Sequence, residues 1–231
     1  MESGALSTEA FRQFTGKVVP YLNVMTRIEG RPHDNLLVEL GYGGHPTLLF
    51  LSPDGEKLGR PRDRTVETFD RAFAAIGELA AVERRQSAGE KGLEFERFLL
   101  EFELMKLRGG ALRQRAKTLQ GLSDDQQARL DAILLGEEVG DLVIRSLGGP
   151  EDLKAAGTRM LEILDGGRCP EMVKDANAWS VLARYGETTQ NRALLLRCSK
   201  GLAENFPDDP RMQSWSRSLE QKAKSIRGTS L

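Results

Sequence analysis

Residues 41–60, "GYGGHPTLLFLSPDGEKLGR", carry the strongest structural signals in the chain. The apolar run at 47–51 predicts a buried strand, and residues 57–60 predict a shorter, more exposed one. Between them, "SPDG" places proline at the second position of a turn and glycine at the fourth, which is typical of a hairpin. We therefore expect two antiparallel strands, the first of which begins at Pro46, a residue without an N–H to donate.

Composition narrows the class of protein. The 231 residues are 39% hydrophobic and 29% charged, which is ordinary for one large globular domain or two small ones. The 33 basic and 34 acidic side chains nearly balance, so the overall charge does not favour a nucleic-acid partner. Because there is no long apolar run and no secretory signal, we expect no membrane insertion and a cytoplasmic location, or a periplasmic or secreted one if an N-terminal signal precedes this sequence.

The cysteines and histidines do not indicate a metal site. Cys169 and Cys198 are too few for a disulfide scaffold, and both histidines, His33 and His45, lie far from them in the sequence. The two cysteines could pair in an oxidising compartment, but separate thiols buried in helices are the favoured interpretation. We expect no metal and no cofactor.

The first 84 residues mix strand and helix signals. Ser7 is expected to cap a short helix that runs through Phe14, and the apolar residues 18–24 predict a buried strand. The segment "LLVELG" predicts a short helix that ends at Gly41. After the hairpin, Thr65 is expected to cap a helix with apolar residues at three- and four-residue spacing up to about Leu79.

From residue 92 onward the pattern is entirely helical, and we expect six or seven helices. Ser123 and Gln126 form a capping-box pattern, and Pro150 is placed for the first turn of another helix. The polar segment at 84–92 predicts a linker between a domain at 1–84 and an all-α domain at 92–231.

Within this half, residues 178–210 predict two antiparallel helices. Trp179, Leu182 and Pro207 resemble the corresponding positions of one tetratricopeptide-type unit. The middle of that pattern does not fit, and no second copy follows at the same period. A generic helical bundle is therefore favoured over a repeat array.

The first half resembles the thioredoxin fold. Gly41 to Thr47 are similar to the turn before the family's cis-proline strand, and "LLFLSPDGEKLGR" resembles the hairpin that follows. The match covers residues 5–83, so the predicted fold class is α/β plus all-α, an incomplete thioredoxin-like domain followed by a helical bundle. The resemblance implies a cis bond between His45 and Pro46, and a peptide-binding backbone formed by Gly44, His45, Pro46 and Thr47. The alternative interpretation of Pro46 is a rigid strand entry without a partner.

The reactive pair of this family is missing from the sequence. Family members that exchange disulfides carry Cys-x-x-Cys at a helix N-terminus, and this chain has no such pair and no visible catalytic residue. The family's first strand, which is central in the sheet, has no counterpart either. We expect it to be replaced by direct pairing of the remaining strands, by another molecule, or by an upstream segment; unpaired edges would also permit self-association. A continuous five-stranded sheet made only from residues 1–84 would contradict this alignment.

Two functions remain open from the sequence. The first is a redox-inactive, thioredoxin-like module that binds a protein or peptide. The second is a thiol–disulfide oxidoreductase whose Cys-x-x-Cys lies upstream of Met1. The first is favoured for the chain as given, because no nucleophile, metal cluster or acid–base pair is evident.

Other conspicuous residues have ordinary structural interpretations. His33 is expected in a solvated loop, and "RPRDR" at 60–64 either binds an anion or forms a solvated surface. Trp179 and Trp215 are expected to anchor helix packing. The acidic side chains of one Leu- and Phe-rich helix are expected to form its wet face: Glu94, Glu96, Glu101 and Glu103.

Overall fold

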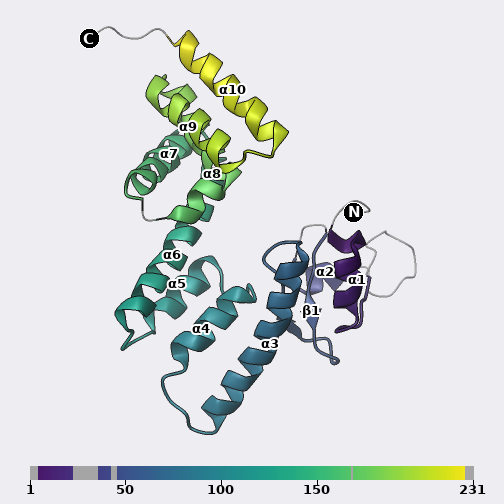
Figure 1. Cartoon of the computed structure of the whole chain (residues 1–231). Helices are drawn as coiled ribbons and strands as arrows, with labels where there is room; N and C mark the ends of the chain where they lie inside the picture. The colour runs from purple at the N-terminus through teal and green to yellow at the C-terminus, as the bar shows by residue number, and fades with distance from the viewer. Residues whose placement is uncertain (1–4, 23–35, 43–45, 168, 227–231) are drawn as a thin grey trace. The chain divides into compact units, whose positions relative to one another are not determined.

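The computed structural model describes residues 5–22, 36–42, 46–167 and 169–226 (Figure 1). The chain consists of two compact units, Met1–Gly121 and Leu122–Leu231. The described residues are mostly helical, with one two-stranded sheet. Among them, no helix has both the length and the apolar character needed to span a bilayer.

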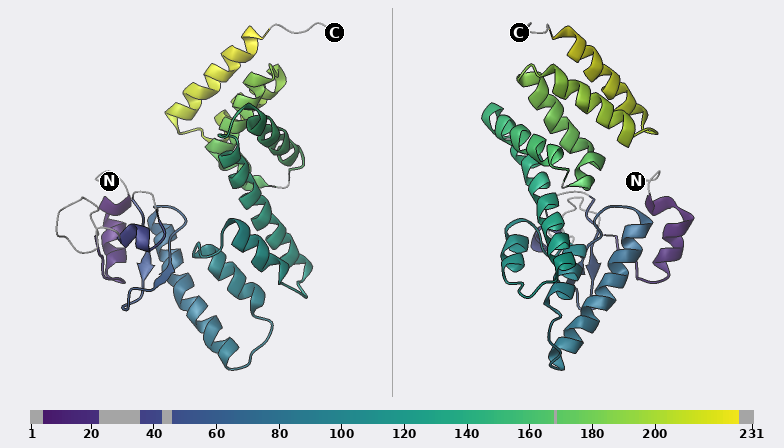
Figure 2. Two further views of the ribbon diagram at one scale, coloured as in Figure 1. Left: turned by 180° about the vertical axis from the view of Figure 1, so that it is seen from behind. Right: turned by 60° about the vertical axis from the view of Figure 1, so that its left-hand side comes forward.

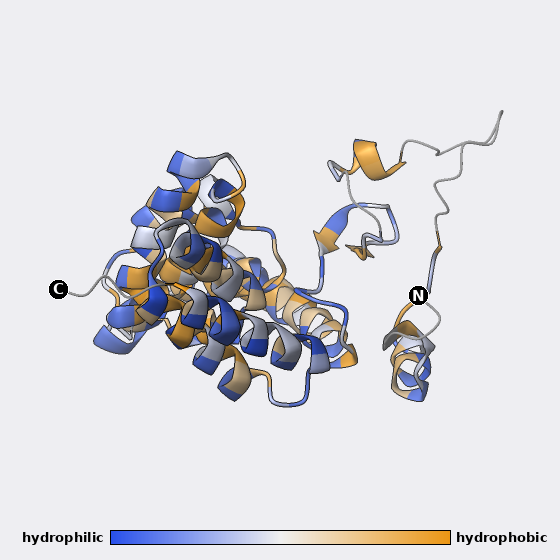
Figure 3. Cartoon of the chain, turned by 90° about the horizontal axis from the view of Figure 1, so that it is seen from above, coloured by the Kyte–Doolittle hydropathy of each residue, from blue (hydrophilic) through white to orange (hydrophobic). Residues whose placement is uncertain are grey.

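The first unit contains the sheet and five α-helices in its described part. In chain order its elements are the 3-10 helix η1 (Ala5–Ser7), α1 (Glu9–Thr15), α2 (Leu36–Glu39), β1 (Phe50–Leu51), β2 (Lys57–Gly59), α3 (Val66–Ser87), α4 (Glu94–Glu103) and α5 (Gly109–Lys117). The short helix α2 is mostly apolar (Figure 3). Gly41 follows it at φ 80°, so the predicted glycine ending is confirmed.

The predicted hairpin is confirmed, but its first strand is shorter than expected. Phe50 pairs with Gly59 and Leu51 with Lys57, with a bulge between the two pairs. Residues 47–49 are outside the strand and half-buried instead of fully buried. The ladder stops because the N–H of Arg60 donates to the carbonyl of Leu104 at 3.0 Å. Pro61, which follows, has no N–H to donate.

The buried strand predicted at 18–24 is wrong for the residues that the structure describes. Residues 18–22 form no strand, and the side chains of Val19, Tyr21 and Leu22 are 93%, 69% and 76% exposed. Pro20 interrupts this run and removes one ladder donor. Residues 23 and 24 lie outside the described part, which contains one two-stranded sheet in place of the direct strand pairing considered above.

An aromatic cluster joins α1, β1 and α3. Helix α1 starts one residue later than predicted: Thr8, in place of Ser7, is its cap and accepts a hydrogen bond from the N–H of Phe11. Five rings pack with centroid separations of 5.5–6.5 Å, mostly edge-on or tilted. They belong to Phe11, Phe14, Phe50, Phe69 and Phe73. The cluster fixes the hairpin against the helices.

The boundary between the units lies after Gly121, whereas a linker was expected at 84–92. Helix α3 is capped by Thr65 as predicted but continues eight residues past Leu79, to Ser87. The chain then turns through two glycines with positive φ and enters α4. The predicted linker thus lies inside the first unit, because α4 covers the apolar face of α3. Their shared core comprises Ala72, Ala75, Leu79, Val82, Leu93, Leu100 and Leu104.

The second unit is a succession of helices. It contains α6 (Asp124–Arg145), α7 (Pro150–Asp165), the 3-10 helix η2 (Pro170–Lys174), α8 (Ala176–Thr188), α9 (Arg192–Asn205) and α10 (Pro210–Ser225). The main packing partner of each α-helix is a neighbour in the sequence (Figure 2). The capping box at Ser123 and the first-turn position of Pro150 are confirmed. Seven α-helices follow residue 92 in the described part, in agreement with the expected six or seven.

Trp179 anchors this helical unit, as predicted. Its side chain is 4% exposed, and its indole N–H donates to the carbonyl of Val173 at 2.8 Å. The indole ring lies directly against Gly201 of α9, where an added Cβ would lie 2.3 Å from a ring carbon. Trp215 packs against the same core from α10 and is partly buried. Close approach of α8 to α9 therefore depends on a residue without a side chain.

Candidate functional site

The peptide-binding residues predicted from the sequence are described only in part. Gly44 and His45, and with them the His45–Pro46 bond, lie outside the described residues, as does His33. Pro46 and Thr47 are half-buried and precede β1. The carbonyl of Pro46 accepts a hydrogen bond from an Nη of Arg64 at 3.2 Å. Residues 46–51, here named the strand entry, are thus tied to the segment that follows the hairpin.

No strand of the described residues pairs with the second side of the strand entry. In the described part of the chain, β1 pairs only with β2, on one side. Neither Leu48 nor Leu49 makes a backbone hydrogen bond to another described residue. Both are half-buried apolar residues, and they precede Phe50 of the aromatic cluster in the sequence. Backbone donors and acceptors that are partly shielded from water are stabilised when a partner strand supplies hydrogen bonds to them. This edge is therefore a candidate docking point for a peptide strand.

Cations from the hairpin collect around Tyr42, just before the strand entry. The Lys57 Nζ lies 5.5 Å from the centroid of the Tyr42 ring, and the Arg60 Cζ lies 5.6 Å from it. The Lys57 ammonium also donates to the carbonyl of Leu40 at 2.9 Å. The basic run at 60–64 is evident in the sequence, but no sequence signal indicates that Lys57 and Arg60 lie beside the same ring.

Asp63 is the one acidic residue within that basic run, and its carboxylate is already bonded. It accepts from the N–H of Thr65 at 2.8 Å and from the hydroxyl of Thr68 at 2.7 Å. Burial raises the pKa of Asp63, but these hydrogen bonds outweigh it and leave the pKa below its usual value. The carboxylate therefore supports the start of α3 and stays ionised near neutral pH.

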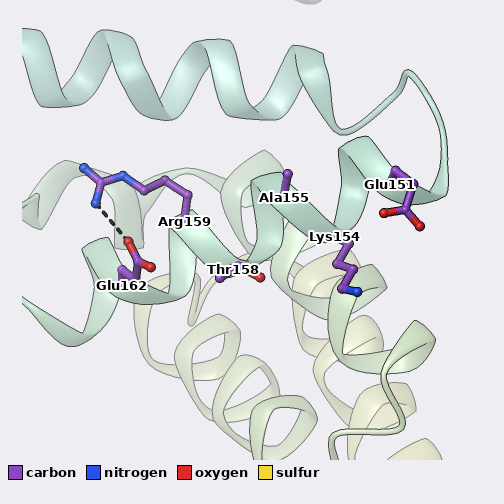
Figure 4. A pocket seen from close by; sticks show the side chains of 6 residues that line it. All are labelled: Glu151, Lys154, Ala155, Thr158, Arg159 and Glu162. Atoms are coloured by element: carbon purple, nitrogen blue, oxygen red, sulfur yellow. Dashed lines mark hydrogen bonds and ion pairs between the residues drawn. The ribbon is translucent and has the colours of Figure 1, made fainter.

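A second candidate is a hollow of about 430 Å³ on one face of α7 (Figure 4). The Arg159 guanidinium donates to Glu138 at 2.6 Å and to Glu162 at 3.0 Å, and these bonds raise the pKa of Arg159. The hydroxyl of Thr158 donates to that of Tyr185 at 3.1 Å. The lining residues are Glu151, Lys154, Ala155, Thr158, Arg159 and Glu162. Because the lining has mixed charge and Arg159 is already neutralised, the hollow does not favour a particular ligand.

The two cysteines are separate thiols, as expected, but the expected burial within a helix holds for Cys198 and is wrong for Cys169. Cys198 is fully buried in α9, and Cys169 is half-buried just before η2, outside any helix. Burial raises the pKa of the Cys198 thiol to about 12, against a smaller opposing effect of Arg197. Cys198 is therefore neutral near pH 7 and lacks the thiolate that nucleophilic or redox chemistry requires.

The described residues also contain no group of three or more His, Cys, Asp or Glu side chains placed to hold a metal ion.

No family model, curated protein or solved structure matches the chain. The thioredoxin-like assignment therefore stays a prediction that rests on residues 41–60 and on the elements around them.

Proposed function

We propose that this chain is a protein-interaction module that binds an extended peptide along the open side of the strand entry. The observation that carries the proposal is the one-sided pairing of β1, with the backbone of Leu48 and Leu49 left without hydrogen bonds to described residues. A peptide strand would supply those bonds, and its alternate side chains would contact the half-buried leucines.

The surrounding structure supports this mode of binding. The hairpin is held against α1 and α3 by the aromatic cluster, so a bound strand would meet a firmly supported edge. The resemblance to the thioredoxin fold independently suggests peptide contact at Pro46 and Thr47. In this proposal the helical second unit binds or positions the partner.

The test uses three fluorescent octapeptides in which valine alternates with threonine, glutamate or lysine. Amide hydrogen exchange of the full chain is measured with and without each peptide. We expect at least one peptide to slow amide exchange at residues 47–51. The same peptide with alternate backbone nitrogens methylated should not slow it. Absence of protection with all three, or equal protection by the methylated peptide, would overturn it.

A further inference from the structure

Residues 18–22, here named the apolar segment, have the composition of a strand but no strand partner among the described residues. Their sequence is Val-Val-Pro-Tyr-Leu, and the side chains of Val19, Tyr21 and Leu22 are exposed. Residues 19–22 make no backbone hydrogen bond to another described residue. Extended backbone is favoured by β-branched and aromatic residues, and by the position of Val19 directly before a proline. The segment therefore presents apolar surface and backbone groups that a neighbouring strand can cover.

Pro20 determines which side of the apolar segment can join a sheet. In a strand, the backbone N–H and C=O groups of successive residues point to opposite sides, so Val19 and Tyr21 share one side and residues 18, 20 and 22 share the other. Proline is tolerated in an edge strand when the side without its N–H faces solvent. The segment can thus pair through Val19 and Tyr21, while its Pro20 side disfavours the addition of a further strand.

The strand entry has the complementary edge. The backbones of Leu48 and Leu49 make no hydrogen bond to another described residue. Proteins commonly protect such edges with charged side chains or prolines, and residues 47–51 contain neither. The apolar segment is also uncharged, so its pairing with this edge brings no like charges together. The segment and the edge therefore match in chemistry.

A second copy can bring the two together. Within one copy they are not paired, since no backbone hydrogen bond joins residues 19–22 to Leu48 or Leu49 in the described part of the chain. The start of the segment is tied to α3, because Lys17 forms an ion pair with Asp70. A second copy can supply the segment while each copy keeps this contact. Every copy carries one segment and one such edge, so a two-fold pair satisfies both edges at once.

We propose that the strand entry binds the apolar segment of a second copy, exchanged reciprocally in a dimer. This inference rests on the proposed function, because it names the partner at the same edge. The N–H and C=O groups of Val19 and Tyr21 pair with the backbone at Leu48 and Leu49, and apolar side chains on both sides leave water. Because Pro20 faces outward and both edges are used, the assembly stops at two copies.

The first measurement follows the full-length chain by sedimentation velocity and amide hydrogen exchange at about 1 to 200 μM, a range in which mass action favours a dimer at the upper end. We expect the mass to rise from one copy to two, and exchange at residues 18–22 and 47–51 to slow together. A chain that stays monomeric would overturn the inference, as would a dimer that leaves either segment unprotected. Protection that is independent of concentration would also overturn it, because each copy would then cover its own edge.

The second measurement uses proline to remove one N–H at a time. Tyr21→Pro removes an N–H that faces the partner, and we expect it to weaken the dimer at least about ten-fold, because the loss occurs at both edges. Leu22→Pro removes an N–H that faces solvent, and Tyr21→Leu removes the ring but keeps the N–H. Both controls should weaken the dimer by no more than about three-fold. Circular dichroism melts verify folding, and equal weakening by Tyr21→Pro and Leu22→Pro would overturn the inference.

The three octapeptides separate failure of this inference from failure of the proposed function. If an octapeptide protects residues 47–51 of a chain that never dimerises, the second-copy inference is wrong and the proposed function stands. If the dimer protects these residues but no octapeptide does, the edge recognises only its own chain, so the general function fails and this inference stands. Where both hold, the octapeptide should dissociate the dimer, because the two compete for one edge.

Discussion

At the scale of single residues, two glycines decide how closely the helices of the second unit approach. Gly157 on α7 faces Tyr185, and Gly201 on α9 faces Trp179. A Cβ at either position would lie 2.3 Å from a ring carbon, well inside van der Waals contact. Both partners are held in place: Tyr185 accepts from Thr158, and Trp179 donates to Val173. Neither ring can therefore move aside without losing a hydrogen bond.

We expect Gly157→Ala and Gly201→Ala each to lower the free energy of unfolding by about 1–3 kcal/mol, because overpacking outweighs the better helix propensity of alanine. Gly140→Ala is the control, since no heavy atom lies within 4 Å of its added Cβ. It should raise stability by up to about 1 kcal/mol. Urea denaturation midpoints measure all three, and a stabilising Gly157→Ala would show that α7 and α8 are not in contact at this point.

Cys198 links stability to alkaline pH. Burial favours its neutral thiol and raises its pKa from 9.0 to about 12. The thiol ionises more readily in the unfolded chain, so its stabilising effect is complete below about pH 9 and is lost as pH rises toward 12. We expect the free energy of unfolding to fall more steeply between pH 9 and 11 in the native chain than in Cys198→Ala. Parallel curves from denaturant titrations would contradict this.

At the scale of elements, polar capping side chains determine where several helices begin. Ser123 accepts from the N–H of Gln126 at 3.3 Å, and the side chain of Gln126 accepts from the N–H of Ser123 at 3.0 Å. Two N–H groups that α6 could not satisfy internally are bonded in this way. Thr65 caps α3 in a similar way, because its side chain accepts a hydrogen bond from the N–H of Thr68. Both caps were predicted from the sequence.

We expect Ser123→Ala to reduce stability by about 1 kcal/mol, because one of these N–H groups loses its acceptor. Ser218→Ala offers a matched control: this serine is exposed within α10 and makes no side-chain hydrogen bond among the described residues. Its effect should stay within about 0.5 kcal/mol. Thermal denaturation of both variants tests the difference, and equal effects would mean that the capping box contributes nothing measurable.

At the scale of the whole molecule, each unit has its own hydrophobic core. Leu79 belongs to the core shared by α3 and α4, and Leu182 belongs to the larger core of α6 to α10. Most of the buried apolar side chains of the described residues thus belong to one of two cores, one for each compact unit. Core truncations should therefore act locally.

We expect Leu79→Ala and Leu182→Ala each to destabilise the unit that contains the residue, by about 2–5 kcal/mol. Hydrogen exchange followed by mass spectrometry on the full chain measures this for both units at once. Leu79→Ala should speed exchange before residue 122, and Leu182→Ala should speed it after. Faster exchange throughout the chain in either variant would show that the two units unfold together.

The sequence by itself determined the local features of this protein. The hairpin turn at 52–55, the caps at Thr65 and Ser123, the first-turn Pro150 and the glycine ending after α2 could all be predicted, because each depends on side chains within a few residues of one another. The site was predicted only in part: Pro46 and Thr47 lie at the strand entry, while Gly44 and His45 are outside the described residues.

Only the tertiary structure decided where these elements are covered and what they meet. It left residues 19–22 exposed, extended the first unit to Gly121 by packing α4 on α3, and brought Lys57 and Arg60 to the ring of Tyr42. The physical reason is that burial and the gathering of charge arise from contacts between residues that are far apart in the sequence. A hydrophobic run indicates that a segment can be buried, and a basic run indicates that it can attract anions. The residues that surround the segment in space determine whether burial or attraction takes place.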